Sequence, residues 1–227
     1  MQRYKTKAII LRRVNYGEAD RIVTFLTPKY GRIAGIVKGA RREKSKLAGG
    51  IELFSESEIT LLKGKGGLDI VTSTRLIKYY RHIISDYERM TVGYMTVALA
   101  NKLTEDGAGG EFYDLLRDAF MALNDADIPA VITELWYRLN IMQIHGTGPN
   151  LRTDSRGKKL SAEERYAFDV RDGAFTASEQ GNITADHIKT WRLLLANPPA
   201  RAAKVKGILE TVQETNALVT RMQEFNT

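Results

Sequence analysis

The alternation of apolar and polar residues changes its period near residue 78. Before that point, short segments rich in β-branched and aromatic residues alternate with glycine-, proline- and charge-rich connections, a pattern typical of β-strands. The predicted strands are Thr6–Arg13, Arg21–Thr27, Arg32–Lys38, Ser57–Leu62 and Asp69–Arg75. Because five short strands fall within about 75 residues, we expect a small OB-type β-barrel, with a sandwich fragment as the alternative.

Glycine residues mark turns and bends in this predicted barrel. Proline and glycine at Pro28 and Gly31 predict the turn between the second and third strands. Gly35 lies inside the third strand, where glycine predicts a bulge or a sharp bend. The glycine-rich stretch Lys63–Gly67 lacks the spacing of a P-loop and does not lead into a helix, so it is predicted to be a hairpin turn.

After residue 78 the apolar residues recur at helical spacing. The pattern predicts helices over 79–103, 112–123, 129–145 and 200–224. Thr184 is expected to cap a further helix that ends near Ala196. These segments predict a mainly helical second half of the chain.

The helical half is interrupted by an irregular insert at about 150–180, which contains two short β-like pieces, Tyr166–Val170 and Ala174–Thr176. The predicted fold is therefore α+β. Residues 1–78 are expected to form the barrel domain, and residues 79–227 a helical domain with a small irregular β insert.

The charges are segregated along the chain. The 227 residues carry a net charge of +7, but residues 1–80 hold 17 Lys and Arg against 7 Asp and Glu, a net of +10. Residues 81–227 hold 17 against 20, a net of −3. Asymmetry of this kind indicates an anionic partner, either nucleic acid or an anionic membrane surface.

Two further features of composition narrow the class of protein. The chain has no cysteine, which excludes disulfides and thiolate zinc sites and agrees with a reducing compartment. The first apolar run, Ala8–Leu11, is followed at once by Arg12 and Arg13 and does not resemble a secretory signal. No stretch approaches the roughly 20 apolar residues that a membrane-spanning helix needs. We expect a cytoplasmic protein that does not enter a membrane.

The most basic segment is the loop after the third predicted strand. Five of its nine residues are cationic: Lys38, Arg41, Arg42, Lys44 and Lys46. Such loops bind nucleic acid without reading its sequence, because they neutralise phosphates and release counterions. The other predicted contacts are Arg12, Arg13, Arg32, Lys63, Lys65 and Tyr30, the last as the aromatic side chain expected to be exposed for base stacking. Phe25 is expected in the core.

No catalytic or metal-binding motif is present. The three histidines, His82, His145 and His187, stand alone in the sequence, and no HExxH, Walker A or G-x-S-x-G pattern occurs. The sequence therefore predicts neither an enzyme nor a cofactor.

The N-terminal residues resemble the RecO family of bacterial recombination mediators. The motif consists of a Gly-Glu-x-Asp-Arg connection at 17–21, a Thr-x-x-Tyr-Gly turn at 27–31 and a Lys-Gly-x-Arg-Arg loop at 38–42. The stretch Gly146–Leu151 is similar to the family's Gly-x-x-Pro-x-Leu segment. Order, spacing and residue types match closely over residues 8–47 and more loosely beyond.

The resemblance implies an OB-fold, a helical domain and no enzymatic turnover, in a bacterial cytoplasmic protein associated with the nucleoid. It implies binding to single- and double-stranded DNA, annealing of complementary strands, and loading of RecA onto DNA coated with single-strand-binding protein. The implied partners are RecR and the acidic C-terminal tail of single-strand-binding protein. Candidate contacts for that tail are Arg201, Lys204 and Lys206, which are expected on the last helix.

The chain departs from the family at one place. Many members carry a four-cysteine zinc module after the Pro-x-Leu segment, but residues 152–178 contain no cysteine here. A zinc ion is therefore not expected. Two other interpretations stay open from the sequence: an OB-type barrel also serves RNA-binding factors, and a basic barrel also suits an adaptor that meets an acidic protein surface.

Overall fold

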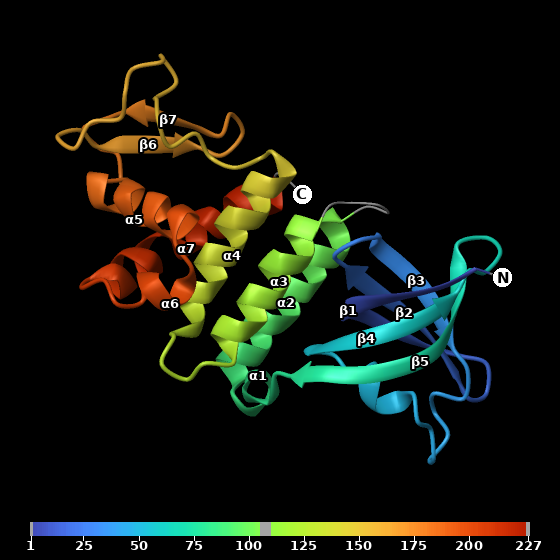
Figure 1. Cartoon of the computed structure of the whole chain (residues 1–227). Coiled ribbons are helices and arrows are strands. Elements are labelled where there is room, and N and C mark those ends of the chain that lie inside the picture. Colours follow the sequence, from blue (N-terminus) through green and yellow to red (C-terminus); the bar gives the residue numbers. More distant parts are fainter. Residues whose placement is uncertain (1, 105–109, 226–227) are drawn as a thin grey trace. The chain divides into compact units, whose positions relative to one another are not determined.

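The computed structural model describes residues 2–104 and 110–225. The fold is α+β, with a five-stranded sheet followed by a mostly helical region, as predicted. Contacts within the chain group it into two compact units, Met1–Asn124 and Asp125–Thr227 (Figure 1). The first unit contains three helices in addition to the strands. The domain boundary expected at residue 78, where strands give way to helices, stays a prediction.

The five predicted strands are confirmed, with ends that differ by a few residues. They are β1 (Arg3–Tyr16), β2 (Asp20–Thr27), β3 (Gly31–Val37), β4 (Ser55–Leu62) and β5 (Leu68–Tyr79), and a 3₁₀ turn (Ala48–Gly50) lies between β3 and β4. The sheet closes into a barrel in the order β1-β2-β3-β5-β4. The β3–β5 pair is parallel and the other pairs are antiparallel.

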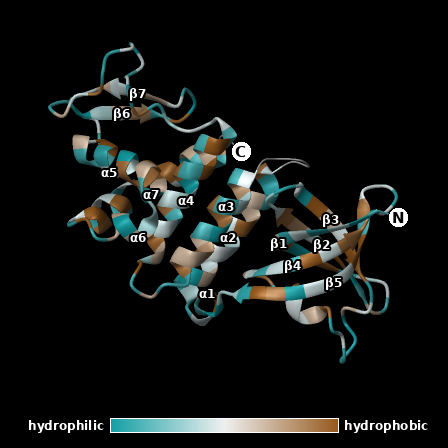
Figure 2. Ribbon diagram, viewed as in Figure 1, coloured by the Kyte–Doolittle hydropathy of each residue, from teal (hydrophilic) through white to brown (hydrophobic). Residues whose placement is uncertain are grey.

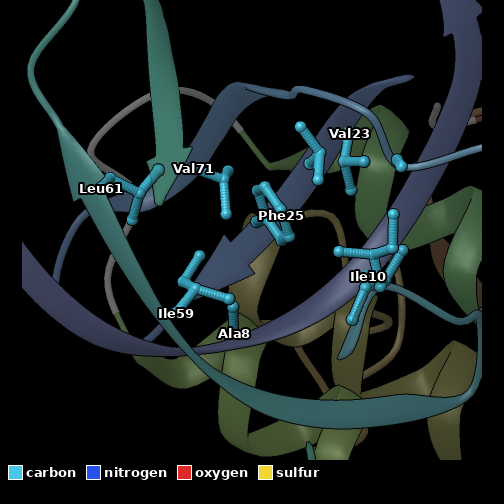
Figure 3. Close-up of a cluster of buried hydrophobic side chains, with 10 residues drawn as sticks. Ala8, Ile10, Val23, Phe25, Ile59, Leu61 and Val71 are labelled. Atoms are coloured by element: carbon cyan, nitrogen blue, oxygen red, sulfur yellow. The ribbon is translucent and has the colours of Figure 1, made fainter. Parts of the chain in front are cut away.

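The inside of the barrel is filled by aliphatic side chains around one aromatic ring. Phe25 is fully buried, as predicted, and is surrounded by apolar residues from β1, β2, β4 and β5 (Figure 3). Labelled neighbours in that view are Ala8, Ile10, Val23, Ile59, Leu61 and Val71. Because side chains alternate between the two faces of a strand, the residues that alternate with these along each strand point out of the barrel.

The prediction of a bulge at Gly35 is wrong. The pairing of β3 runs without a shift through Gly35, which lies opposite Val23 on β2 and Asp69 on β5. Irregular pairing occurs instead in β1, between Ile10 and Arg12, and twice between β4 and β5. Gly35 is required by packing, because a Cβ atom there would lie 2.8 Å from the Val71 side chain inside the barrel.

Three helices complete the first unit: α1 (Arg81–Ser85), α2 (Tyr87–Leu103) and α3 (Gly110–Leu123). The single helix predicted over 79–103 is wrong, because β5 continues to Tyr79 and Asp86 starts a new helix by accepting a hydrogen bond from the Arg89 N–H at 2.9 Å. α2 packs against β1, and α3 packs against β2. The Tyr113 hydroxyl on α3 donates to the buried Glu56 carboxylate on β4 at 2.7 Å.

The second unit contains α4 (Ala130–His145), the hairpin β6 (Tyr166–Asp169) and β7 (Ala174–Ala177), then α5 (Ala185–Ala196), α6 (Pro199–Ala202) and α7 (Ile208–Phe225). Hydrophobic and hydrophilic residues alternate around these helices, as the brown and teal segments of Figure 2 show. The predicted β-like pieces of the insert are confirmed as β6 and β7, and the helix expected after Thr184 is confirmed as α5.

The single helix predicted over 200–224 is wrong. It is divided into α6 and α7 by a turn that ends at Gly207, whose φ of 79° lies in the left-handed region that glycine favours. Arg201 is therefore on the short α6, while Lys204 and Lys206 lie in the turn. All three side chains are exposed.

Candidate nucleic-acid interface

The predicted contact residues of the barrel other than Arg13 lie in two groups at opposite ends of β3, and Lys29, which was not predicted, joins one of them. One group surrounds the turns next to Gly31, where β3 begins, and we call it the groove end. It contains Arg12, Lys29, Tyr30, Arg32, Lys63 and Lys65. The other group lies on the loop that leaves Val37, where β3 ends, and we call it the loop end. It contains Lys38, Arg41, Arg42, Lys44 and Lys46.

The groove end is a hollow of about 730 Å³ on the outside of the barrel. Side chains from β1, from the β2–β3 turn and from the β4–β5 turn line it, among them Arg12, Lys29 and Lys63. The Lys63 N–H donates to the Gln2 carbonyl at 2.9 Å, which fixes the β4–β5 turn beside the start of β1. Figure 1 shows this turn next to the N-terminus, away from the loop after β3.

Residues 63–67 form the hairpin turn that the sequence predicts, between the antiparallel strands β4 and β5. The Asp69 carboxylate holds it in place by accepting hydrogen bonds from the Gly64 N–H at 2.8 Å and from the Tyr4 hydroxyl. Burial and this bond to Asp69 raise the pKa of Tyr4. Residue 64 must be glycine, because a Cβ atom would lie 1.8 Å from the Leu68 carbonyl oxygen. The turn therefore presents Lys63 and Lys65 from a rigid base.

Tyr30 is less exposed than its turn position predicts. Its half-buried ring contacts the Tyr4 ring edge-on at 4.8 Å between centroids, and the Lys29 Nζ lies 5.7 Å from the centre of its ring. Tyr16 at the tip of the β1–β2 hairpin is 53 % exposed, whereas the sequence favoured Tyr30 and left the exposure of the other barrel aromatics open. Its place beside Gly17, in a two-strand hairpin tip, is the sequence signal that indicates exposure.

Three of the predicted contact residues are bonded to other parts of the barrel unit. The Arg32 guanidinium donates to the Asn101 carbonyl on α2 at 2.8 Å. Arg13 forms a salt bridge of 2.6 Å with Glu52. The Arg41 guanidinium of the loop also donates to a carbonyl, that of Gly17 at 3.4 Å. These three cations contribute charge to the surface but are held by the protein itself.

The loop end is built by contacts between two segments far apart in the sequence. The Gly39 N–H donates to the Asp20 carboxylate at 2.7 Å, and the Arg41 N–H donates to the Ala19 carbonyl at 2.9 Å. Gly39 has a φ of 65°, which favours glycine. The Gly-Glu-x-Asp-Arg connection and the Lys-Gly-x-Arg-Arg loop thus hold each other, and this fixes the basic loop beside Tyr16.

The loop cations are available to a ligand. Lys38, Arg41, Arg42, Lys44 and Lys46 are all exposed, and none forms an ion pair within residues 2–104 and 110–225. Elsewhere on the barrel, Lys5 and Arg75 both bond to Glu58, and this lowers the pKa of that carboxyl. The loop cations therefore differ from these paired cations, because no carboxylate among the described residues compensates them in an ion pair.

The described residues contain no cluster of three or more side chains able to hold a metal ion. The rings of His82 and His187 make structural contacts: the His82 Nδ1 lies 2.9 Å from the Asn124 carbonyl. The His187 Nδ1 accepts from the Thr184 N–H at 3.1 Å, and its Nε2 lies 2.6 Å from the Glu214 carboxylate. In the same described part of the chain, no helix is both long enough and apolar enough to cross a membrane.

The fold and the site define a two-part α+β protein, in which a small closed barrel with an ordered basic loop is followed by a helical unit. Comparison with known proteins gives the family. Residues 1–80 match the family model "Recombination protein O N terminal", and residues 84–226 match "Recombination protein O C terminal". The chain belongs to the RecO family of DNA repair and recombination proteins.

Individual relatives agree. Two proteins named "DNA repair protein RecO" from strains of Dehalococcoides mccartyi are 30 % and 33 % identical to the chain, each alignment covering 93 % of the chain and 85 % of the relative. A protein of the same name from Halalkalibacterium halodurans is 31 % identical, over 76 % of the chain and 66 % of the relative.

The insert does not fit the zinc ion that the resemblance associates with other members. In the turn that opens this region, the Asp154 carboxylate accepts hydrogen bonds from the Arg156 and Lys158 N–H groups at 2.9 and 2.8 Å. The Ser155 hydroxyl lies 3.1 Å from that of Thr176. Hydroxyls and a carboxylate already bonded to backbone do not make the tetrahedral nitrogen and sulfur set that structural zinc prefers. Hydrogen bonds form the turn instead.

Proposed function

We propose that this protein is a non-catalytic, DNA-binding recombination mediator. In this proposal it binds single- and double-stranded DNA, anneals complementary strands, and helps load RecA onto DNA coated with single-strand-binding protein. One observation carries the DNA-binding step: the five loop cations are exposed, held on an ordered loop and without ion pairs among the described residues. Membership of the RecO family supports the role in repair.

We infer that the closed sheet is an OB-type barrel. Five strands, the order β1-β2-β3-β5-β4 and the long connection between β3 and β4 support this assignment. Barrels of this type bind oligonucleotides on their outer face and turns, which is where the groove end and the loop end lie.

Contacts with phosphate alone suit annealing. Two approaching single strands repel each other, and a surface that neutralises phosphates lowers this repulsion without selecting a sequence. Base pairing then decides which strands combine. Lysine and arginine contacts that exchange with salt also allow the strands to slide into register.

The partners proposed for this chain are RecR and the acidic tail of single-strand-binding protein, in the bacterial cytoplasm at the nucleoid. Arg201, Lys204 and Lys206 are the candidate contacts for the tail. Their exposure, next to the exposed apolar side chains of Val205 and Leu209, supports this assignment, because an acidic tail with apolar residues needs both kinds of contact.

The test is a charge reversal in the loop with a matched control elsewhere. The loop variant Arg41→Glu with Arg42→Glu is expected to weaken binding to a single-stranded oligonucleotide and to lower its log–log salt slope by about 1.4, since each lost phosphate contact removes about 0.7. The control Lys159→Glu with Arg171→Glu changes net charge equally, on exposed residues of the insert. Fluorescence anisotropy at several salt concentrations measures both.

Equal losses in the two variants would show that net charge, and not the loop, controls binding. Unchanged binding in the loop variant would remove the loop from the interface. Running the same titration with an RNA oligomer of identical sequence tests the RNA-binding alternative, which requires RNA to bind more tightly than DNA.

A further inference from the structure

The groove end and the loop end are far enough apart to act separately. β3 connects them through seven residues, Gly31–Val37, and six steps of about 3.3 Å give a separation of roughly 20 Å. Different connections of the barrel form the two ends. The β2–β3 and β4–β5 turns form the groove end, and the loop after β3 forms the loop end.

An uncharged row of aliphatic side chains crosses the sheet on the side of the loop end, since its β3 member, Ile36, is one residue from Val37. Val14 pairs with Ile22, Ile22 pairs with Ile36, and Ile36 pairs with Ile70, so one residue from each of four adjacent strands stands in line. Their neighbours Val23, Gly35 and Val71 face the core, so this row faces outward. Val14 is 41 % exposed, and the three isoleucines are half-buried.

This arrangement separates positive charge from apolar surface. A single strand that runs from one end to the other lays its backbone over the aliphatic row, whose side chains offer the phosphates no compensating charge. Two strands avoid this cost, because each keeps its phosphates over one cationic group. Their unpaired bases, which are flat and weakly polar on their faces, then meet over the aliphatic row.

We propose that the groove end and the loop end bind two different DNA strands, whose bases meet over the aliphatic row. Lys29 and Lys63 hold one backbone, and Arg41 and Arg42 hold the other. Each end also supplies one tyrosine, Tyr30 or Tyr16, against which a base can stack. This inference rests on the proposed DNA binding and adds the number and position of the strands.

Stoichiometry tests the inference directly. An oligothymidylate of about six nucleotides, within the range of single OB-fold sites, is titrated into the protein at low salt and followed by calorimetry. The wild-type protein is expected to bind two oligonucleotides. The loop variant (Arg41→Glu with Arg42→Glu) and a groove variant (Lys29→Glu with Lys63→Glu) are each expected to bind one. All four residues are exposed, and unfolding curves check that both variants fold normally.

Annealing gives a second, independent readout. Each variant is expected to lose at least tenfold in annealing rate with complementary oligonucleotides, and an equimolar mixture of the two variants is expected not to recover it. Val14→Glu, which places a carboxylate in the aliphatic row, is expected to lower the annealing rate while both oligonucleotides still bind.

Different failures have different meanings. A wild-type protein that binds one oligonucleotide, with either variant abolishing it, would show one continuous path and overturn this inference while DNA binding stands. Full annealing by either variant would overturn it as well. No binding of any oligonucleotide would overturn the proposed function itself.

Discussion

The two units of the molecule use their cations in different ways. In the first unit, the five loop cations project from the barrel without ion pairs among the described residues. In the second unit, Arg138 is buried, bonds to Glu134 on its own helix, and donates to Gln223 on α7 at 2.6 Å. Arg192 donates twice to the Leu151 carbonyl, at 2.6 and 3.1 Å. The loop cations are therefore placed to serve a partner, whereas Arg138 and Arg192 serve the fold.

Physical chemistry explains why the two uses exclude each other. A cation removed from water needs compensation from a carboxylate or from several hydrogen bonds, and once compensated it has little left to offer a ligand. An exposed cation keeps its water at no cost and exchanges it for phosphate. The charge balance follows this division: residues 1–124 hold 21 Lys and Arg against 14 Asp and Glu, a net of +7, and residues 125–227 hold 13 against 13.

The largest expected effect comes from removing the buried cation. Arg138→Ala leaves Glu134 and Gln223 without their main partner, so we expect a loss of about 3 kcal/mol in the free energy of unfolding. Arg42→Ala, the matched change at the loop end, is expected to alter it by less than about 0.5 kcal/mol. Urea denaturation measures both. Equal effects on stability would break the comparison between the units.

A smaller effect is expected in the insert. Asp154→Ala removes the acceptor of the Arg156 and Lys158 N–H groups, and we expect a loss of about 2 kcal/mol. Because hydrogen bonds form this turn, a strong chelator is expected to leave the thermal unfolding curve of the wild-type protein unchanged. A chelator that lowers the melting temperature would show that a metal ion holds the insert after all.

The sequence predicts the strands well because their signals are local. Period-two alternation and turn residues identify β1 to β5 within a few residues, and Phe25 is identified as core by the same alternation. The errors occur where a tertiary contact or a single residue decides. Asp86 divides one predicted helix and Gly207 divides another, and in both cases the apolar spacing continues across the break.

Gly35 illustrates a different limit. A glycine inside a strand indicates either a bulge or a close approach, and the sequence does not distinguish the two. The close approach involves Val71, 36 positions later in the chain, so only the assembled barrel reveals it. The true irregularity of β1 lies between Ile10 and Arg12, where the sequence contains no glycine at all.

The candidate site shows the same division. The residue types of the loop and of the hairpin turn are readable from the sequence, because charge and glycine are local properties. Their separation at opposite ends of β3, the partial burial of Tyr30 and the exposure of Tyr16 depend on how the strands pair. A list of basic residues therefore predicts an anionic partner but not how many binding sites they form.

The smallest expected effect concerns a buried hydroxyl of the first unit, in contrast to the buried cation of the second. The Tyr80 side chain is fully buried, and its hydroxyl has no hydrogen-bond partner among the described residues. Tyr80→Phe is therefore expected to change stability at neutral pH by less than about 0.5 kcal/mol. Tyr113→Phe, which removes the bond to Glu56, serves as the contrasting variant and is expected to cost more.

The stability of the wild-type protein and that of the Tyr80→Phe variant are expected to differ at alkaline pH. Burial raises the pKa of Tyr80 to about 12, because the folded chain disfavours the ionised hydroxyl. The stability linked to keeping this proton is fully present below the pKa of about 10 that tyrosine has in the unfolded chain, and it is lost as the pH rises through 12. The wild-type protein is expected to lose stability more steeply over this range than Tyr80→Phe, because phenylalanine has no proton to release. Urea denaturation at pH 7, 10 and 11 measures the difference. Parallel curves for the two proteins would mean that the Tyr80 hydroxyl is ionised as easily in the folded chain as in the unfolded one.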